Sequence, residues 1–229
     1  MALKNASHPY LPTTLNLPHY VPNTLNAFHI LGVFFVVLSV LMGVTIHFAG
    51  TKKHTRPWST RGKLCWFALC AFIHSVLEGY FSVFHKTFPG GTNFLDQLWK
   101  EYSLCDSRYV SGDPFTVCME SITGFIDGPL SFIALYAFFY NKPYRYTVQL
   151  ILSLCQLYGD VLYFSTEFKE GFVHGEMYHP QYFWFYFVFM NAIWIVIPIL
   201  CIADALKHLH AAQSLADSPK ERGKGKKHK

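Results

Sequence analysis

The sequence predicts an all-α polytopic membrane protein with five transmembrane helices. Of its 229 residues, 52% are apolar and 18% aromatic, whereas only 14% are charged; a typical soluble domain has about 25% charged residues. Five apolar stretches are each long enough to cross a hydrocarbon layer of about 30 Å, which takes roughly 20 helical residues. The many Tyr, Phe and Trp residues suit aromatic belts at the two membrane surfaces.

The five apolar stretches set the domain organisation. A polar segment, residues 1–28, precedes the first helix, and a basic tail, residues 207–229, follows the last one. The region 29–206 between them is a single membrane domain. Its predicted helices cover residues 29–49, 64–85, 115–140, 145–168 and 182–206.

Lys and Arg residues predict how the chain is oriented. The connections alternate between the two membrane faces, which places 14 of these residues on one side and five on the other. By the positive-inside rule the N-terminus is lumenal and the C-terminus cytosolic. The final residues 226–229, Lys-Lys-His-Lys, resemble a di-lysine retrieval signal and predict the endoplasmic reticulum membrane, or the nuclear envelope. No nucleic-acid-binding module accompanies the basic tail, so nucleic acid is not an expected partner.

Ionisable side chains inside the predicted helices indicate a functional site. His74 lies in the middle of the second stretch, and Glu78 follows one turn later on the same face. Each charge at membrane depth costs at least about 2.5–3.5 kcal/mol, so such residues mark cavities or pathways. The other polar residues within the spans are Glu120, Asp127, Asp160 and Asn191.

These residues are expected at one depth. A rise of about 1.5 Å per residue places them, together with Trp194, about 8–18 Å from the lumenal helix ends. Glu120, Thr123 and Asp127 share a helix face by their i, i+3, i+7 spacing. The first helix has no carboxylate, so helices two to five are expected to enclose the site while helix one packs outside it.

Each polar residue also has a structural interpretation, because buried polar side chains often hold membrane helices together by hydrogen bonds. This interpretation is favoured for Asn191 alone and for the stripe Gln149, Gln156 and Asp160, and it stays open for Asp127. Two carboxylates and an imidazole at one depth are too costly for that role. His74, Glu78 and Glu120 are therefore the predicted catalytic residues.

The chemistry of these groups favours an isomerase. A carboxylic acid in an apolar cavity can hold a proton and give it to a substrate, and a carboxylate paired with imidazole can accept one. An aromatic face such as Trp194 stabilises a cation formed between the two steps. No GxGxxG, Walker or His-box motif is present, and His74 is the only mid-span histidine. Neither a cofactor nor a metal is expected.

Several segments also resemble the emopamil-binding protein family, of the EXPERA type, from about residue 8 to 215. The segments that carry the resemblance are Cys65-Trp66-Phe67-Ala68, Ile73-His74-Ser75-Val76-Leu77-Glu78-Gly79, Gln97-Leu98-Trp99-Lys100-Glu101-Tyr102, Asp106-Ser107-Arg108-Tyr109, Val117-Cys118-Met119-Glu120-Ser121-Ile122-Thr123, Tyr158-Gly159-Asp160-Val161-Leu162-Tyr163-Phe164 and residues 182–194.

This resemblance implies a five-helix, cofactor-free sterol isomerase that moves a ring double bond from C8–C9 to C7–C8. It implies a sterol cavity within the bundle, a Δ8-sterol substrate (zymostenol- or zymosterol-like) from the bilayer, and binding of cationic amphiphilic amines. His74, Glu78 and Glu120 match the family's functional His and acids. Its supporting Thr, Asn and Trp match Thr123, Asn191 and Trp194.

The resemblance also includes a loop motif, and the sequence departs from the family at one position. Asp106, Arg108 and Tyr109 match a loop motif that closes or supports the cavity mouth. Asp127 stands where relatives carry an apolar aromatic residue, so its role is unassigned, like that of Asp160.

The resulting hypothesis is that Glu120, linked to His74, protonates C9, and that Glu78 receives the C7 proton; the acid and base labels are exchangeable at this stage. The rival class is a non-catalytic sterol and amine receptor of the sigma-2 type. A proton-coupled transporter is the weakest reading, because no internal repeat is visible. The assembly state, including a homodimer, stays open.

Overall fold

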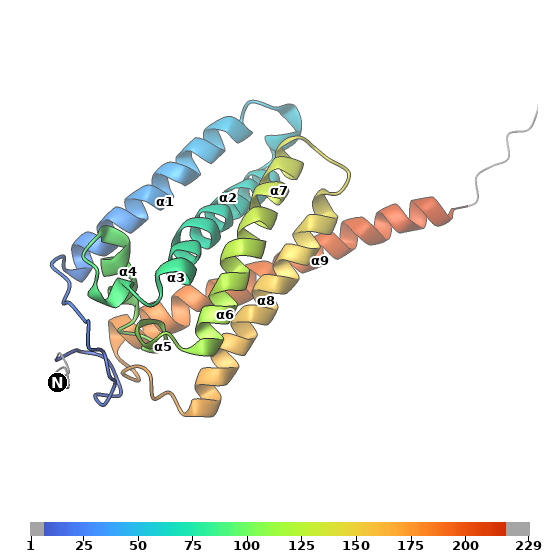
Figure 1. Cartoon of the computed structure of the whole chain (residues 1–229). Helices are drawn as coiled ribbons and strands as arrows, with labels where there is room; N and C mark the ends of the chain where they lie inside the picture. The colour runs from blue at the N-terminus through green and yellow to red at the C-terminus, as the bar shows by residue number, and fades with distance from the viewer. Residues whose placement is uncertain (1–6, 219–229) are drawn as a thin grey trace, which may run out of the picture.

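A computed structural model describes residues 7–218 as a bundle of helices in which no strand occurs over that range (Figure 1). Five helical spans are long and apolar enough to cross a membrane. They comprise Ala27–Ala49, Trp58–Phe84, Pro114–Phe139, Arg145–Glu170 and Pro180–Asp217. The predicted fold class is therefore confirmed. Lys226 and Lys227 of the di-lysine resemblance lie outside the described residues.

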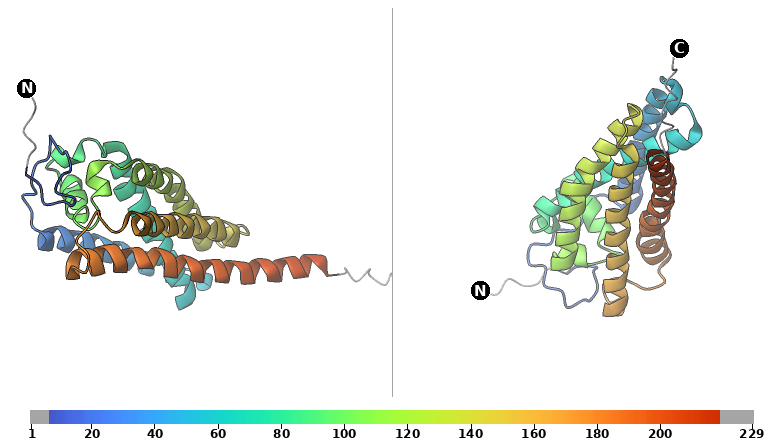
Figure 2. Two further views of the ribbon diagram at one scale, coloured as in Figure 1. Left: turned by 90° about the horizontal axis from the view of Figure 1, so that it is seen from below. Right: turned by 90° about the vertical axis from the view of Figure 1, so that its right-hand side faces the viewer.

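The spans begin and end close to the predicted residues, with two larger differences. The second begins at Trp58 rather than residue 64, because polar residues such as Lys63 fit its first turns at the membrane surface. The fifth runs to Asp217 rather than residue 206, and α9 (Asn191–Asp217) extends beyond the rest of the bundle (Figure 2). Its last turns are polar, and a helix outside the bilayer needs no apolar sequence.

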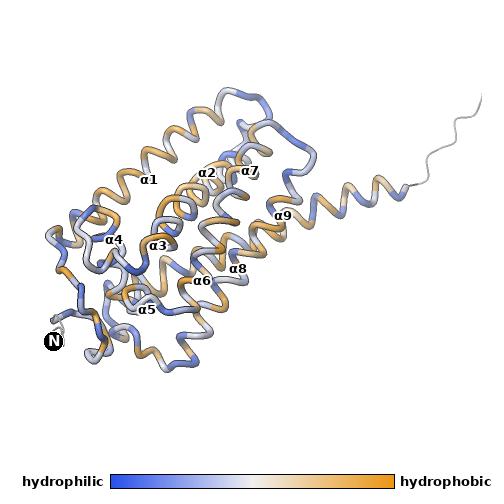
Figure 3. Tube along the Cα trace, viewed as in Figure 1, coloured by the Kyte–Doolittle hydropathy of each residue, from blue (hydrophilic) through white to orange (hydrophobic). Residues whose placement is uncertain are grey.

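Apolar surface faces outward along the spans, as a lipid-embedded bundle requires. Figure 3 shows the hydrophobic colour along the helices and the hydrophilic colour at their connections. The helix α1 (Ala27–Ala49) is the most lipid-exposed example, with Phe28, Val36 and Val40 all exposed. In a bilayer such side chains contact acyl chains, so their exposure carries no cost.

Three of the five spans contain a π-helical segment, in which the hydrogen bonds run from i to i+5. In the second span, Ile73–Glu78 separates α2 (Trp58–Phe72) from α3 (Gly79–Phe84). In the third, Thr123–Asp127 separates α6 (Pro114–Ile122) from α7 (Gly128–Phe139). In the fifth, Pro180–Met190 precedes α9. The fourth span is one continuous helix, α8 (Arg145–Glu170).

The second and third spans approach closely at these segments because two glycines allow it. A Cβ on Gly124 would lie 3.0 Å from the Cα of Gly79, and one on Gly128 would collide with the Ser75 hydroxyl. The two π-helical segments are thus held face to face, which brings the residues they carry to one level of the bundle.

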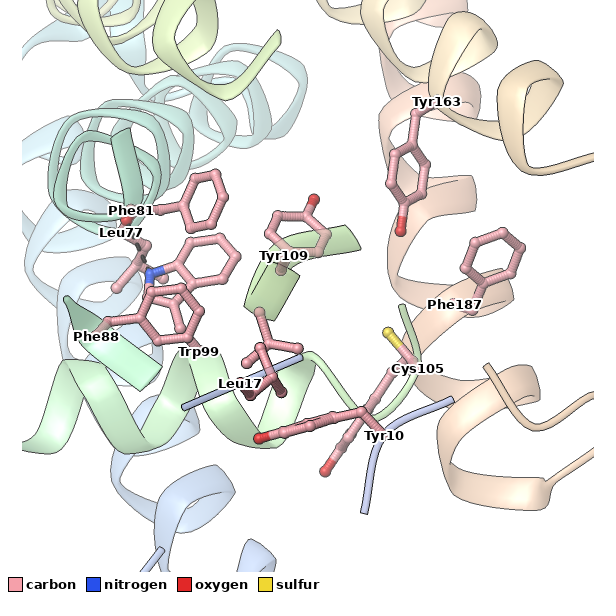
Figure 4. Packing of buried hydrophobic residues seen from close by; sticks show 12 residues of the cluster. Tyr10, Leu17, Leu77, Phe81, Phe88, Trp99, Cys105, Tyr109, Tyr163 and Phe187 are labelled. Atoms are coloured by element: carbon pink, nitrogen blue, oxygen red, sulfur yellow. Dashed lines mark hydrogen bonds between the residues drawn. The ribbon is translucent and has the colours of Figure 1, made fainter. Parts of the chain in front are cut away.

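Two short helices, α4 (Phe94–Tyr102) and α5 (Arg108–Ser111), cap one end of the bundle. The N-terminal segment covers them, since the Tyr10 hydroxyl donates to the Lys100 carbonyl at 3.1 Å and Lys100 Nζ donates to the Val21 carbonyl at 2.7 Å. An aromatic cluster fills the space below (Figure 4), in which Trp99 stacks on Tyr109 at 5.0 Å between ring centroids. The cap thereby fixes α5 beneath α4.

Candidate active site

His74 and Glu78 form a buried pair in the π-helical segment of the second span. Nδ1 of His74 lies 2.7 Å from Oε2 of Glu78, with side-chain exposures of 3% and 12%. On the other side of the ring, the Gln156 amide nitrogen lies 2.9 Å from Nε2 of His74. The imidazole is thus held between the Glu78 carboxylate and the Gln156 amide.

Glu120 has its own partners and does not bond to His74. The Tyr109 hydroxyl donates to Oε1 at 2.5 Å, and the Thr123 hydroxyl lies 3.2 Å from Oε2. The hypothesis that linked His74 to Glu120 is therefore wrong in this detail, because the imidazole reaches the carboxylate four residues away on its own helix. Glu120 is buried, at 5% exposure.

Asn191 and Trp194 approach the same place from α9. Asn191 Nδ2 donates to the Phe187 carbonyl at 2.7 Å, and its side chain also contacts the Tyr102 hydroxyl at 3.1 Å. The ring of Trp194 lies 4.8 Å from that of His74, centroid to centroid. The aromatic wall and the imidazole are thus neighbours, as their predicted depths imply.

Two cavities meet at these residues. The larger contains about 810 Å³ of space not filled by atoms, open solvent included, and the smaller about 420 Å³. Five residues line both cavities: Glu78, Tyr109, Glu120, Asn191 and Trp194. Among the described residues that line them there is no Lys or Arg, so the carboxyl groups set the local potential and favour a positive charge.

The first helix also contributes to the larger cavity, contrary to the prediction that it packs outside. Ile30, Leu31 and Phe34 of α1 form part of the wall. The prediction considered only polar residues within the spans, and these three residues are apolar.

The loop motif anchors Tyr109 instead of closing the cavity with charged groups. Arg108 donates through Nη2 to Asp106 at 2.6 Å and through Nη1 to Thr166 of α8 at 2.8 Å. Its Nε lies 3.4 Å from Glu167. Neither Asp106 nor Arg108 lines either cavity, whereas Tyr109, the next residue, lines both. The ion pairs therefore hold α5 against α8 and direct the Tyr109 hydroxyl to Glu120.

The same cluster includes the only group of potential metal ligands found among residues 7–218. Donor atoms of Asp106, Glu167 and His174 lie within 4.8 Å of one another. Arg108 already supplies the positive charge at this point, so the group fits an ion-pair cluster better than a metal site. The hydrogen bond from His174 to Glu167, 2.7 Å long, raises the pKa of His174.

The two unassigned acids differ in position. Asp160 lines the smaller cavity, and its Oδ2 has no hydrogen-bond partner among the described residues. Asp127 is buried at 1% exposure, lines neither cavity, and has no partner for either carboxyl oxygen in the same part of the chain. The structure thus brings Asp160 to the site and leaves Asp127 beside it.

Sequence reasoning missed three contacts of the site. Gln156 belongs to the stripe that is predicted to be structural, but its amide nitrogen lies 2.9 Å from Nε2 of His74. Tyr102 and Glu101 lie on α4, outside the membrane spans, and both line the larger cavity. No signal within the spans could have indicated them.

These features define a five-helix membrane bundle with an internal cavity lined by apolar side chains and carboxyl groups. The family model described as EXPERA (EXPanded EBP superfamily) matches residues 94–205. The chain is 51% identical to the 3-beta-hydroxysteroid-Delta(8),Delta(7)-isomerase of Rattus norvegicus, with 92% of each chain covered. It is 48% identical to the protein of that name in Cavia porcellus, with 96% of each covered. It is also 37% identical to an isomeliandiol synthase of Melia azedarach, over 67% of this chain and 72% of that one.

The chain belongs to the EXPERA family. By its similarity to these relatives it is an enzyme of the isomerase class, which sets aside the interpretation as a non-catalytic receptor.

Proposed function

We propose that this protein is a sterol Δ8→Δ7 isomerase of cholesterol biosynthesis, which shifts a ring double bond through a carbocation. The observation that supports this most is the shared boundary of the two cavities, where Glu78 and Glu120 lie and no Lys or Arg is among the described lining residues. Such a site stabilises a developing positive charge more than a neutral substrate, as catalysis requires. The relatives' printed name describes the same double-bond positions.

The proposed reaction begins with protonation of C9 by Glu120. Glu120 is buried and has no cationic partner, which favours the neutral carboxyl. The electron pair of the C8–C9 double bond forms the new C9–H bond and leaves a cation at C8. Trp194, beside His74, presents an aromatic face to that cation.

Loss of the C7 proton completes the shift. The C7–H electron pair forms the C7–C8 double bond, and Glu78 accepts the proton with His74 as its hydrogen-bonded partner. One proton enters and one leaves, so the balanced reaction uses no oxidant, reductant or cofactor. Thr123 and Asn191 hold the surrounding side chains through the hydrogen bonds described above.

The test is conversion of a Δ8-sterol in deuterated water by microsomes that contain the protein. Wild type should give a Δ7-sterol with deuterium at C9, and Glu78→Gln and Glu120→Gln should each abolish turnover without loss of protein. Glu176→Gln, which changes an exposed acid, is the matched control. Near-normal conversion by either active-site variant would refute the assignment.

Cationic amphiphilic amines are proposed to occupy the same cavity. An ammonium group resembles the C8 cation in charge, and the wall offers it Glu78 and Glu120 without a competing basic residue. Such amines should compete with the sterol, and both Gln variants should weaken them. Binding unaffected by either substitution would place the amines elsewhere.

The proposed location is the endoplasmic reticulum membrane and the nuclear envelope continuous with it, with a cytosolic C-terminus. The basic connections lie together at one end of the bundle, since Lys52 lies 3.7 Å from the ring of Tyr140 and Lys63 pairs with Asp204 at 2.7 Å. The positive-inside rule makes that end cytosolic, so α4 and α5 lie at the lumenal face. Protease protection of an N-terminal tag in intact microsomes tests this orientation.

A further inference from the structure

Glu101 is a buried acid in the cavity wall that the proposed mechanism does not use. It lies on α4 at 8% exposure and lines the larger cavity, as do Glu78 and Glu120. Burial raises the pKa of Glu101. A carboxyl group in this position must find hydrogen-bond partners or remain costly.

The protein satisfies only one of its two oxygens. The Tyr186 hydroxyl donates to Oε1 at 3.0 Å, and Gln181 Nε2 donates to the same oxygen at 3.3 Å. None of the residues in the range 7–218 donates to Oε2 or forms an ion pair with Glu101. The neighbouring Lys100 is directed away, with its Nζ bonded to two backbone carbonyls. Oε2 is therefore available to a donor on a ligand.

The position of Glu101 suits the hydroxyl end of a sterol. Tyr186, which contacts Glu101, precedes Asn191 by five residues, which is about one turn of this π-helical segment. Asn191 lies at the boundary where Glu78 and Glu120 stand. In a sterol the C3 hydroxyl and the reacting C7–C9 atoms are separated by a comparable span of two fused rings. The wall between includes apolar side chains such as Leu77 and Met190.

We propose that Oε2 of Glu101 accepts a hydrogen bond from the 3β-hydroxyl of the sterol, so that this residue fixes the ring system in register with Glu78 and Glu120. This rests on the proposed function. The α4 helix caps the membrane end of the bundle, and a sterol hydroxyl in a bilayer also lies at the membrane surface. The substrate therefore enters the cavity without reversing its orientation.

The experiment compares a Δ8-sterol bearing the 3β-hydroxyl with its 3-deoxy analogue, for wild type, Glu101→Ala and Glu101→Gln. Wild type should prefer the hydroxylated sterol by about 10- to 100-fold in kcat/KM, as expected for a hydrogen bond to a buried charged acceptor. Glu101→Ala should lose most of that preference and keep its rate on the 3-deoxy sterol. Glu101→Gln preserves size and should lose part of it. Glu176→Gln should behave as wild type.

Two results would overturn the inference. One is an equal loss on both sterols in both variants, which indicates a purely structural role; the other is an unchanged preference for the hydroxyl. Failure of the proposed function looks different, because wild type would then convert neither sterol. Glu101→Gln, which preserves the size of the side chain, keeps the inference testable if Glu101→Ala does not accumulate.

Discussion

Removal of the Tyr109 hydroxyl tests whether Glu120 needs its hydrogen-bonded setting. Tyr109 is 3% exposed and donates to Oε1 of Glu120 at 2.5 Å. Burial raises the pKa of Tyr109, so the hydroxyl stays a donor across the working pH range. Glu120 becomes a carboxylate as it gives its proton to C9, and a hydrogen bond to a charged group contributes about 1.5–3 kcal/mol. Full loss of this in the transition state corresponds to roughly 10- to 150-fold in rate.

The assay is steady-state conversion of the Δ8-sterol by purified Tyr109→Phe. We expect kcat to fall by about 10- to 100-fold while KM stays near the wild-type value, because the ring still packs on Trp99. Tyr178→Phe removes an exposed hydroxyl and serves as the control. A kcat within twofold of wild type would refute the role given to Tyr109. So would a loss explained entirely by a lower amount of folded protein.

Two further predictions concern stability. Asp127→Asn replaces a buried carboxyl that has no hydrogen-bond partner among the described residues, so the unfolding temperature should rise by about 2–4 °C. Turnover should stay near the wild-type value. A lower unfolding temperature or a loss of turnover would contradict this prediction. His174 has a pKa raised above 6.5 by Glu167, so its contribution to stability is complete below pH 6.5 and is lost as pH rises through the raised value. Thermal unfolding of His174→Asn should therefore depend less on pH than wild type between pH 6 and 8, while His210→Asn should match wild type.

The sequence was sufficient for features that follow from local spacing. The apolar stretches predict the spans because a bilayer demands a fixed helix length. The i, i+4 spacing brings His74 to Glu78, and the i, i+3 spacing brings Thr123 to Glu120. These contacts form within one helix, so no knowledge of the packing is needed.

Features that depend on packing between segments could not be predicted. The Tyr109–Glu120 bond needs α5 to be held by the contacts of Arg108 with Thr166 and Glu167 of α8, which are 58 and 59 residues away in the sequence. The contribution of α1 to the cavity wall could not be predicted, because its apolar residues do not differ in type from those of the other spans. Glu101 lies in a short helix outside the membrane, where a glutamate is expected on the surface and draws no attention.

The π-helical segment of the third span explains why Asp127 does not share a helix face with Glu120 and Thr123, as its i, i+3, i+7 spacing predicts. A π-helical turn holds more residues than an α-helical turn, so each residue rotates less about the axis. Over Thr123–Asp127 this deficit adds up to roughly a fifth of a turn. Glu120 and Thr123 line the smaller cavity, whereas Asp127, predicted on their face, is rotated away from it. The widening therefore removes Asp127 from the wall of the smaller cavity, whereas Glu120 and Thr123, which precede it in the chain, remain there. Near-normal turnover of Asp127→Asn is therefore expected from the geometry of this π-helical segment, which places the Asp127 side chain outside the cavity.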